Sequence, residues 1–243
     1  MKIALIADIH GNAVALDAVL SDISKERVDQ IICLGDIVNG PQPLKVLKRV
    51  RELRCPIVMG NADGWLLGQF TPEPEGEIGK RILDMGNWCR DQLSATDLDF
   101  LKSFEPTIRA QLNDETELLC FHGSPRSYDE IIRATTPDEE LEPIFVGLDA
   151  QIYAGGHTHT PMLRRYKSSF LINPGSVGLP YFIDAKSGSP RNLAEGEYAL
   201  LRADGRDLSV DFRRVPFDAE EFARAVLQTG MPHAEWFAAE WRK

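Results

Sequence analysis

The fold is decided first by residues 2–12, which read KIALIADIHGN. Residues 3–7 are consecutive apolar side chains, and Asp8 ends the run. A short apolar run of this kind, closed by polar residues and glycine, is typical of a strand buried on both faces of a parallel sheet. Residues 13–23 then place apolar side chains at helical spacing, which predicts a helix packed against that strand.

The strand–helix pattern continues through the first sixty residues. Residues 31–34 predict a second buried strand, and Pro41 and Pro43 begin a helix that carries apolar side chains as far as Val50. Residues 55–59 predict a third strand. This alternation indicates a parallel sheet with helices against it and right-handed crossovers.

The rest of the chain is predicted to combine helices with strands, and its last hundred residues favour antiparallel pairing. Ala203-Asp204-Gly205-Arg206 gives a hairpin signal. The predicted elements are a surface loop at 71–79, helices at 80–92 and 96–104, strands at 106–112, 117–121, 152–154, 162–166, 169–172, 198–201 and 208–212, and a final helix from Asp218 to Leu227.

Composition sets the class of protein. The 243 residues are 43% hydrophobic and 26% charged, enough apolar material for a large core. The net charge of −10 argues against binding to duplex DNA or to an anionic membrane. No apolar run reaches the ~18 residues of a membrane helix, and the opening run is too short for a secretory signal. We therefore expect a cytoplasmic protein with one domain over residues 1–243 and a helical tail from about residue 216.

The candidate chemistry lies where predicted strands end, because polar residues stand beside glycine at each of these points. The carboxyl ends of parallel strands are where α/β sheets bind their ligands. Carboxylate, imidazole and carboxamide groups suit divalent Mn, Fe, Zn, Co or Ni. Seven candidates exceed the need of one ion and fit two ions that share a bridging carboxylate. The candidates are Asp8, His10, Asp36, Asn61, His122, His157 and His159.

These ordered motifs resemble the calcineurin-like metallophosphoesterase superfamily, whose pattern is DxH, GDxxD, GNH followed by Asp or Glu, a lone His, and GHxH. The resemblance runs from residue 1 to about 215. Three flanking segments, 122–126, 160–162 and 173–178, resemble its bacterial and archaeal phosphodiesterase and phosphatase branch. The resemblance implies an α/β fold, a four-layer α/β/β/α sandwich of two mixed sheets flanked by helices.

The resemblance also implies a role for each candidate. The expected activity is hydrolysis of phosphate mono- or diesters by metal-activated hydroxide, with manganese foremost among the metals and a small phosphorylated or nucleotide-like substrate. Asp36, Asn61 and His10 are the expected catalytic residues. The implied ligands are Asp8, His10 and His159 for the first ion, Asn61, His122 and His157 for the second, and Asp36 as the bridge.

The sequence departs from the family pattern at two positions. Asn39 stands where the second Asp of GDxxD is expected, which changes the surroundings of the ligands and not the ligands themselves. Ala62 stands where GNH has its histidine, a residue that in the family contacts phosphate and can protonate the leaving group. The proton source is left open between His10 and a metal-bound water.

Several residues carry a plainer alternative. Arg126 either contacts a substrate phosphate or forms a surface ion pair, and Ser176 either lines the site or only completes a turn. His233, Trp236 and Trp241 are expected to pack the tail. For the whole chain, the alternatives are a non-catalytic scaffold on the same fold and a phosphoprotein phosphatase. The oligomeric state is left open.

Overall fold

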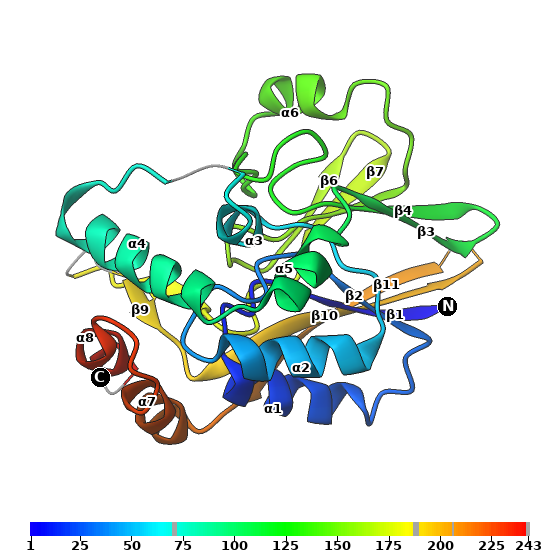
Figure 1. The fold of residues 1–243 in the computed structure, drawn as a ribbon. Helices are drawn as coiled ribbons and strands as arrows, with labels where there is room; N and C mark the ends of the chain where they lie inside the picture. Colours follow the sequence, from blue (N-terminus) through cyan, green and yellow to red (C-terminus); the bar gives the residue numbers. More distant parts are fainter. Residues whose placement is uncertain (70–71, 187–189, 206, 242–243) are drawn as a thin grey trace.

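The structure is a computed structural model that describes residues 1–69, 72–186, 190–205 and 207–241. Its two main sheets are both mixed (Figure 1). The first consists, in spatial order, of β11 (Asp207–Pro216), β10 (Glu195–Asp204), β1 (Lys2–Ile6) and β2 (Gln30–Cys33). The second consists of β3 (Ile108–Asn113), β4 (Thr116–Cys120), β5 (Ile152–Ala154), β7 (Ser169–Asn173) and β6 (Met162–Tyr166). A small pair, β8 (Tyr181–Ile183) and β9 (Pro190–Asn192), is separate from them.

Helices follow the strands in chain order and cover the sheets from outside. They are α1 (Ala13–Ile23), α2 (Pro43–Leu53), α3 (Asn61–Leu66), α4 (Gly76–Asp91), α5 (Ala95–Lys102), α6 (Asp138–Phe145), α7 (Ala219–Leu227) and α8 (Ala234–Ala239). Figure 1 shows α1 and α2 on the first-sheet side and α6 above β6 and β7. No helix within the described residues has the length and hydrophobicity needed to cross a bilayer.

The layers follow from the alternation of side chains along β1. Ile3 and Leu5 point into the core between the two sheets, where they join Ile152 of β5. Ala4 and Ile6 point the other way, into a core shared with the apolar faces of α1 and α2. A third core lies between the second sheet and α6. The predicted arrangement of two mixed sheets flanked by helices is therefore confirmed.

Capping residues and an N-terminal proline explain why the starts of α1, α2 and α7 could be predicted from the sequence. Helix α1 has the predicted bounds, and the Asn12 side chain caps it by accepting a hydrogen bond from the Ala15 N–H at 2.9 Å. Helix α2 begins at Pro43, and Asp218 caps α7 by accepting from Glu221 N–H. The tail then packs on α4, where His233 Nε2 lies 2.9 Å from Asp84 Oδ2.

Other predictions need correction. Residues 55–59 do not form a full strand but two single bridges, one from Ile57 to Cys33 and one from Val58 to Glu105, since Pro56 has no N–H to donate. Strand β5 pairs in parallel with both β4 and β7, against the predicted antiparallel pairing. The predicted loop at 71–79 is shorter, because α4 begins at Gly76. Thr71 of that loop and Arg206 of the hairpin signal lie outside the described residues.

Candidate metal centre

The seven candidate ligands come together at one edge of the molecule, where strands of both sheets end. Asp8 follows β1 and Asp36 follows β2, two neighbouring parallel strands of the first sheet. His122 follows β4 and His157 follows β5, two neighbouring parallel strands of the second sheet. The carboxyl ends of the two sheets thus face a common site. Asn61 enters it as the first residue of α3, and His10 and His159 each lie two residues after another candidate.

The backbone at these positions is unusual. Asp8, His10, Asp36, His157 and His159 all adopt positive φ, between 45° and 69°. Few residues other than glycine adopt this conformation, and each instance costs on the order of 1 kcal/mol or more. Hydrogen bonds between the loop after β1 and the loop after β2 stabilise this backbone conformation. The Asp8 N–H donates to the Gly35 carbonyl oxygen and the His10 N–H to that of Asp36, both at 3.0 Å. Backbone strain concentrated on the candidate side chains is typical of functional sites.

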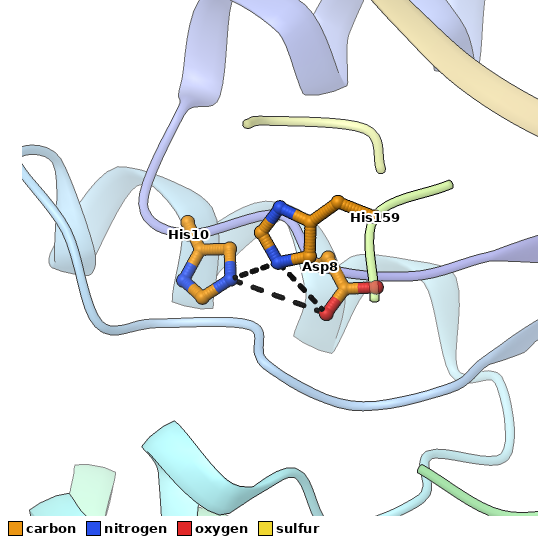
Figure 2. Close-up of side chains that lie close together, drawn as sticks. All are labelled: Asp8, His10 and His159. Carbon is orange, nitrogen blue, oxygen red and sulfur yellow. Dashed lines mark hydrogen bonds and ion pairs between the residues drawn. The ribbon is translucent and has the colours of Figure 1, made fainter. Parts of the chain in front are cut away.

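Asp8, His10 and His159 form the first group of donors (Figure 2). The Nε2 atoms of His10 and His159 are 3.1 Å apart, and His159 Nε2 is 3.4 Å from Asp8 Oδ1. His10 Nε2 lies 4.0 Å from the same oxygen. Asp8 is fully buried, and its carboxylate also accepts from the His157 backbone N–H at 3.1 Å. Three donor atoms therefore converge on one point, as a metal ligand set does.

Asp36, His122 and His157 form the second group. Asn61 lies within it, since its Oδ1 is 2.9 Å from His122 Nε2 and 3.1 Å from His157 Nδ1. His122 is fully buried, whereas His157 is half-buried and borders the solvent side of the site. The amide of Asn61 supplies an uncharged oxygen, so this group differs chemically from the first.

Asp36 lies between the two groups. Its Oδ2 is 3.5 Å from His10 Nε2 and 3.4 Å from His122 Nε2. Its Oδ1 accepts a hydrogen bond from the Ala62 N–H at 2.8 Å, which fixes the orientation of the carboxylate. One oxygen of a buried carboxylate thus faces both donor sets, the arrangement that a bridging ligand requires.

The charges within the site are strongly coupled. Burial opposes the charged form of His122, yet the Asp36 carboxylate outweighs burial and raises the pKa of His122 to about 10. Burial likewise opposes ionisation of Asp36, but charged His122 holds the pKa of Asp36 well below its usual range. Asp8 overcomes burial to raise the pKa of His159, while burial lowers the pKa of His10 and of His157. Each donor group therefore has one histidine with a raised pKa, which retains its proton, and one with a lowered pKa, which is readily neutral.

The histidine rings are oriented to present a lone pair to a cation. His122 Nδ1 lies 2.7 Å from the Leu34 carbonyl oxygen, and His159 Nδ1 lies 2.7 Å from that of Leu179. A carbonyl only accepts, so Nδ1 carries the hydrogen and Nε2 of the neutral ring is left for a metal. The donor types, their convergence and this support fit two divalent cations.

Asp63 supports the site, although the sequence assigned it no role. Its buried carboxylate accepts from the backbone N–H groups of Ile37, Val38 and Gly60 at 3.0 to 3.3 Å. It therefore ties the loop of Asp36 to Gly60, the residue just before α3, whose N–H it caps. Burial and the nearby Asp36 charge raise the pKa of Asp63 to about 7. The spacing of three residues between Gly60 and Asp63 was the signal available for this role.

The structure decides between the two interpretations given to Ser176 and to Arg126. Ser176 is buried beneath the site, where its hydroxyl donates to the Asp8 carbonyl at 2.7 Å, so it shapes the Asp8 turn. Arg126 forms the surface ion pair, with Glu130 at 2.5 Å, and donates to the Pro143 carbonyl. Ala62 is buried in the first turn of α3, beside Asn61.

Comparisons with known proteins agree with this geometry. Residues 1–203 match the calcineurin-like phosphoesterase superfamily domain, and this range contains all seven candidate ligands. An uncharacterised protein of Methanocaldococcus jannaschii is 29% identical over 241 residues, which cover 96% of this chain and 94% of that protein. The crystal structure of a metallophosphoesterase from Sphaerobacter thermophilus has a TM-score of 0.76 at 27% identity, covering 100% of this chain and 98% of that one. A phosphodiesterase of Escherichia coli is 25% identical over 203 residues, covering 78% of this chain and 84% of that protein.

Proposed function

The chain belongs to the calcineurin-like phosphoesterase superfamily, and on that premise we propose that it is a dimetal-dependent phosphoesterase acting on phosphate mono- or diesters. The observation that carries the proposal is the position of Asp36, whose Oδ2 lies 3.5 Å from one donor group and 3.4 Å from the other. Two separate mononuclear sites would have no need of that shared oxygen. The proposed substrate is a small phosphorylated or nucleotide-like molecule.

The proposed ligand set follows the two donor groups. Asp8, His10 and His159 would hold the first ion, Asn61, His122 and His157 would hold the second, and Asp36 would serve both. Oxygen and nitrogen donors without thiolate suit manganese, and iron, zinc, cobalt or nickel would also fit. When bound, two such ions act as a Lewis acid that activates water and stabilises charge on phosphate oxygens.

The protein's own residues would position and desolvate the reacting groups. Asp36 and Asp8 are buried, so their charges act in a low dielectric, where attraction to cations is strong. Asn61 combines one acceptor oxygen with two N–H donors, so its amide group can also donate to a phosphate oxygen. His10 has a lowered pKa and is half-buried, which makes it a ligand that is neutral near pH 7.

The leaving group still needs a proton. Ala62 has no titratable group, and His10 as a neutral ligand has no acidic proton to give, so of the two sources left open the proposal favours water. This favours esters of acidic alcohols, whose anions leave without help. It also disfavours the phosphoprotein phosphatase alternative, which involves alkyl esters of serine or threonine.

A non-catalytic scaffold is the second alternative. A scaffold gains nothing from strained backbone at five donor positions or from imidazoles oriented by carbonyl groups. These features cost stability and are expected to persist only where the donors are used.

Metal analysis combined with a phosphodiesterase assay tests the proposal. Protein reconstituted with manganese should approach two equivalents per chain and hydrolyse bis-p-nitrophenyl phosphate. Chelation should abolish the activity and added manganese should restore it. A single tightly bound ion that sustains full activity would contradict the shared site, and fully loaded protein without activity would favour the scaffold.

A further inference from the structure

A cavity of about 340 Å³ opens directly beside His157. Its walls come from residues 131–135, from residues 157, 158 and 160–162 after β5, and from Tyr181 at the start of β8. Its volume lies within the range of about 300 to 1,000 Å³ found for small-molecule sites. The cavity shares His157 with the candidate metal centre, so a molecule that places phosphate on that centre can extend into it.

Much of the cavity wall is apolar, although the cavity adjoins the charged side chains of the candidate metal centre. Ile131 is 46% exposed and Tyr181 is 37% exposed, which is high for large hydrophobic side chains. Met162 adds a third apolar surface. The Tyr181 ring lies 5.9 Å from the His159 ring, centroid to centroid, so an aromatic face borders the metal centre itself. Apolar and aromatic side chains left open to solvent at a site edge indicate an organic ligand.

One wall of the cavity is held in place by Arg164 of β6. Its Nη1 donates to the backbone carbonyls of Arg133, Ala134 and Thr136, at 3.3, 3.1 and 2.6 Å. Its Nη2 pairs with Asp138 Oδ1 at 2.5 Å. A single guanidinium thus binds three carbonyls of the segment 133–136. It thereby fixes a loop that has no regular secondary structure. A fixed wall lowers the entropic cost of binding a ligand.

The cavity also has a cation available. Arg133 lines it, and among the residues that the structure describes its guanidinium has no hydrogen bond or ion pair. Thr158 and Thr160 contribute hydroxyl-bearing residues to the same lining. The walls therefore combine apolar and aromatic surface with hydroxyls and a positive charge, the composition that suits a polar aromatic group carrying phosphate.

We propose that this cavity binds the organic group of the substrate, and that this group is aromatic and of nucleoside size. The proposal rests on the proposed phosphoesterase function and names the substrate class for the same site. Tyr181 and Ile131 are its specificity-determining residues, and Arg164 is a positioning residue that acts through the 133–136 backbone.

Two esters with the same leaving group test the proposal. One is the p-nitrophenyl ester of thymidine 5′-phosphate, and the other is the p-nitrophenyl ester of methyl phosphate. Manganese-loaded wild-type protein should show the higher kcat/KM for the thymidine ester. Tyr181→Ala should lower the ratio of the two kcat/KM values by roughly 5- to 100-fold, the range expected for loss of one base–aromatic contact. Phe182→Ala is the matched control, since Phe182 is the next residue, is 48% exposed and does not line the cavity.

Arg164 is tested by separating KM from kcat. Arg164→Met should raise KM for the thymidine ester several-fold with a smaller change in kcat, since the wall moves and the metal ligands do not. Arg164→Lys retains N–H donors for the carbonyls and should recover part of the loss. Equal effects on both esters, or none, would remove Arg164 from the proposal.

Binding of thymidine 5′-phosphate, measured by calorimetry against methyl phosphate, separates the two proposals. If wild-type protein hydrolyses neither ester but binds the nucleotide more tightly, and Tyr181→Ala abolishes the difference, the cavity proposal stands and the phosphoesterase proposal fails. If the esters are hydrolysed but neither the kcat/KM ratio nor nucleotide binding depends on Tyr181, the cavity proposal is overturned.

Discussion

The two sides of the candidate site are built in opposite ways. On the metal side, Asp8 and Asp36 are 0% and 3% exposed and are fixed by backbone strain and hydrogen bonds between loops. On the cavity side, Ile131 and Tyr181 are 46% and 37% exposed, and one arginine side chain holds the wall. A change on the metal side disturbs packing across both sheets, whereas a change on the cavity side disturbs one loop. Under the two proposals, chemistry and specificity would rest on different residues, with His157 alone shared between them.

The strongest test of the metal side is Asp36→Asn. Asp36 faces both donor groups, so the substitution removes a negative charge where two cations would meet. We expect at least a ~100-fold loss of kcat on bis-p-nitrophenyl phosphate, consistent with loss of a metal-centred Lewis acid. The same loss is expected for substrates with large and small organic groups. Near wild-type activity in a folded variant would refute the bridging role.

Gly60→Ala tests the packing of the metal side without replacing a donor residue. An added methyl group at residue 60 would overlap the backbone nitrogen and the Oδ1 atom of Asp36. We expect a loss of activity of roughly 10- to 100-fold, the scale of a misplacement of about 1 Å. Gly230→Ala is the control, since Gly230 has open space around it, and its positive φ, unlike the φ of −93° at Gly60, adds only local backbone strain far from the donors. Metal content should fall in the first variant only.

The pH dependence of metal binding distinguishes the imidazoles. His122 must lose a proton before its Nε2 can bind a cation, and Asp36 raises its pKa to about 10. Manganese affinity of the metal-free protein should therefore rise about tenfold per pH unit where one such proton is released, and level off near pH 10. Calorimetry in buffers of different ionisation enthalpy measures the proton count. No proton release near pH 7 would mean that His122 is neutral before metal arrives.

The smallest expected effect comes from Ala62→His. A histidine beside Asn61 would place an acid where the family has one. We expect the ratio of kcat/KM for glycerol phosphate to that for p-nitrophenyl phosphate to rise about 3- to 10-fold, because only the alkoxide needs the proton. A variant that binds both metals without changing this ratio would show that the proton comes from elsewhere.

The sequence predicted the metal side far better than the cavity side, for a physical reason. Asp8, Asp36 and His157 lie within three residues of the ends of buried strands, so short local motifs beside glycine reveal them. Strand β5 was found, but its parallel pairing was not, because three residues carry no signal of their neighbours. Tyr181 and Ile131 meet only in the folded chain, and Arg164 contacts a segment about 30 residues earlier. No local pattern marks such residues, so the cavity emerged only from the structure.

The pairing of β1 with β10 has a consequence for biosynthesis. Ile3 lies opposite Leu201, so β1 waits for a strand translated almost 200 residues later before its sheet is complete. At about 5 to 20 residues per second, that wait is about ten seconds or more. Asp8 likewise waits for His159, which contributes to the same donor group. Metal capture is therefore expected only after residue 159 has been made, and a chain truncated before His159 would lack a donor of the first group.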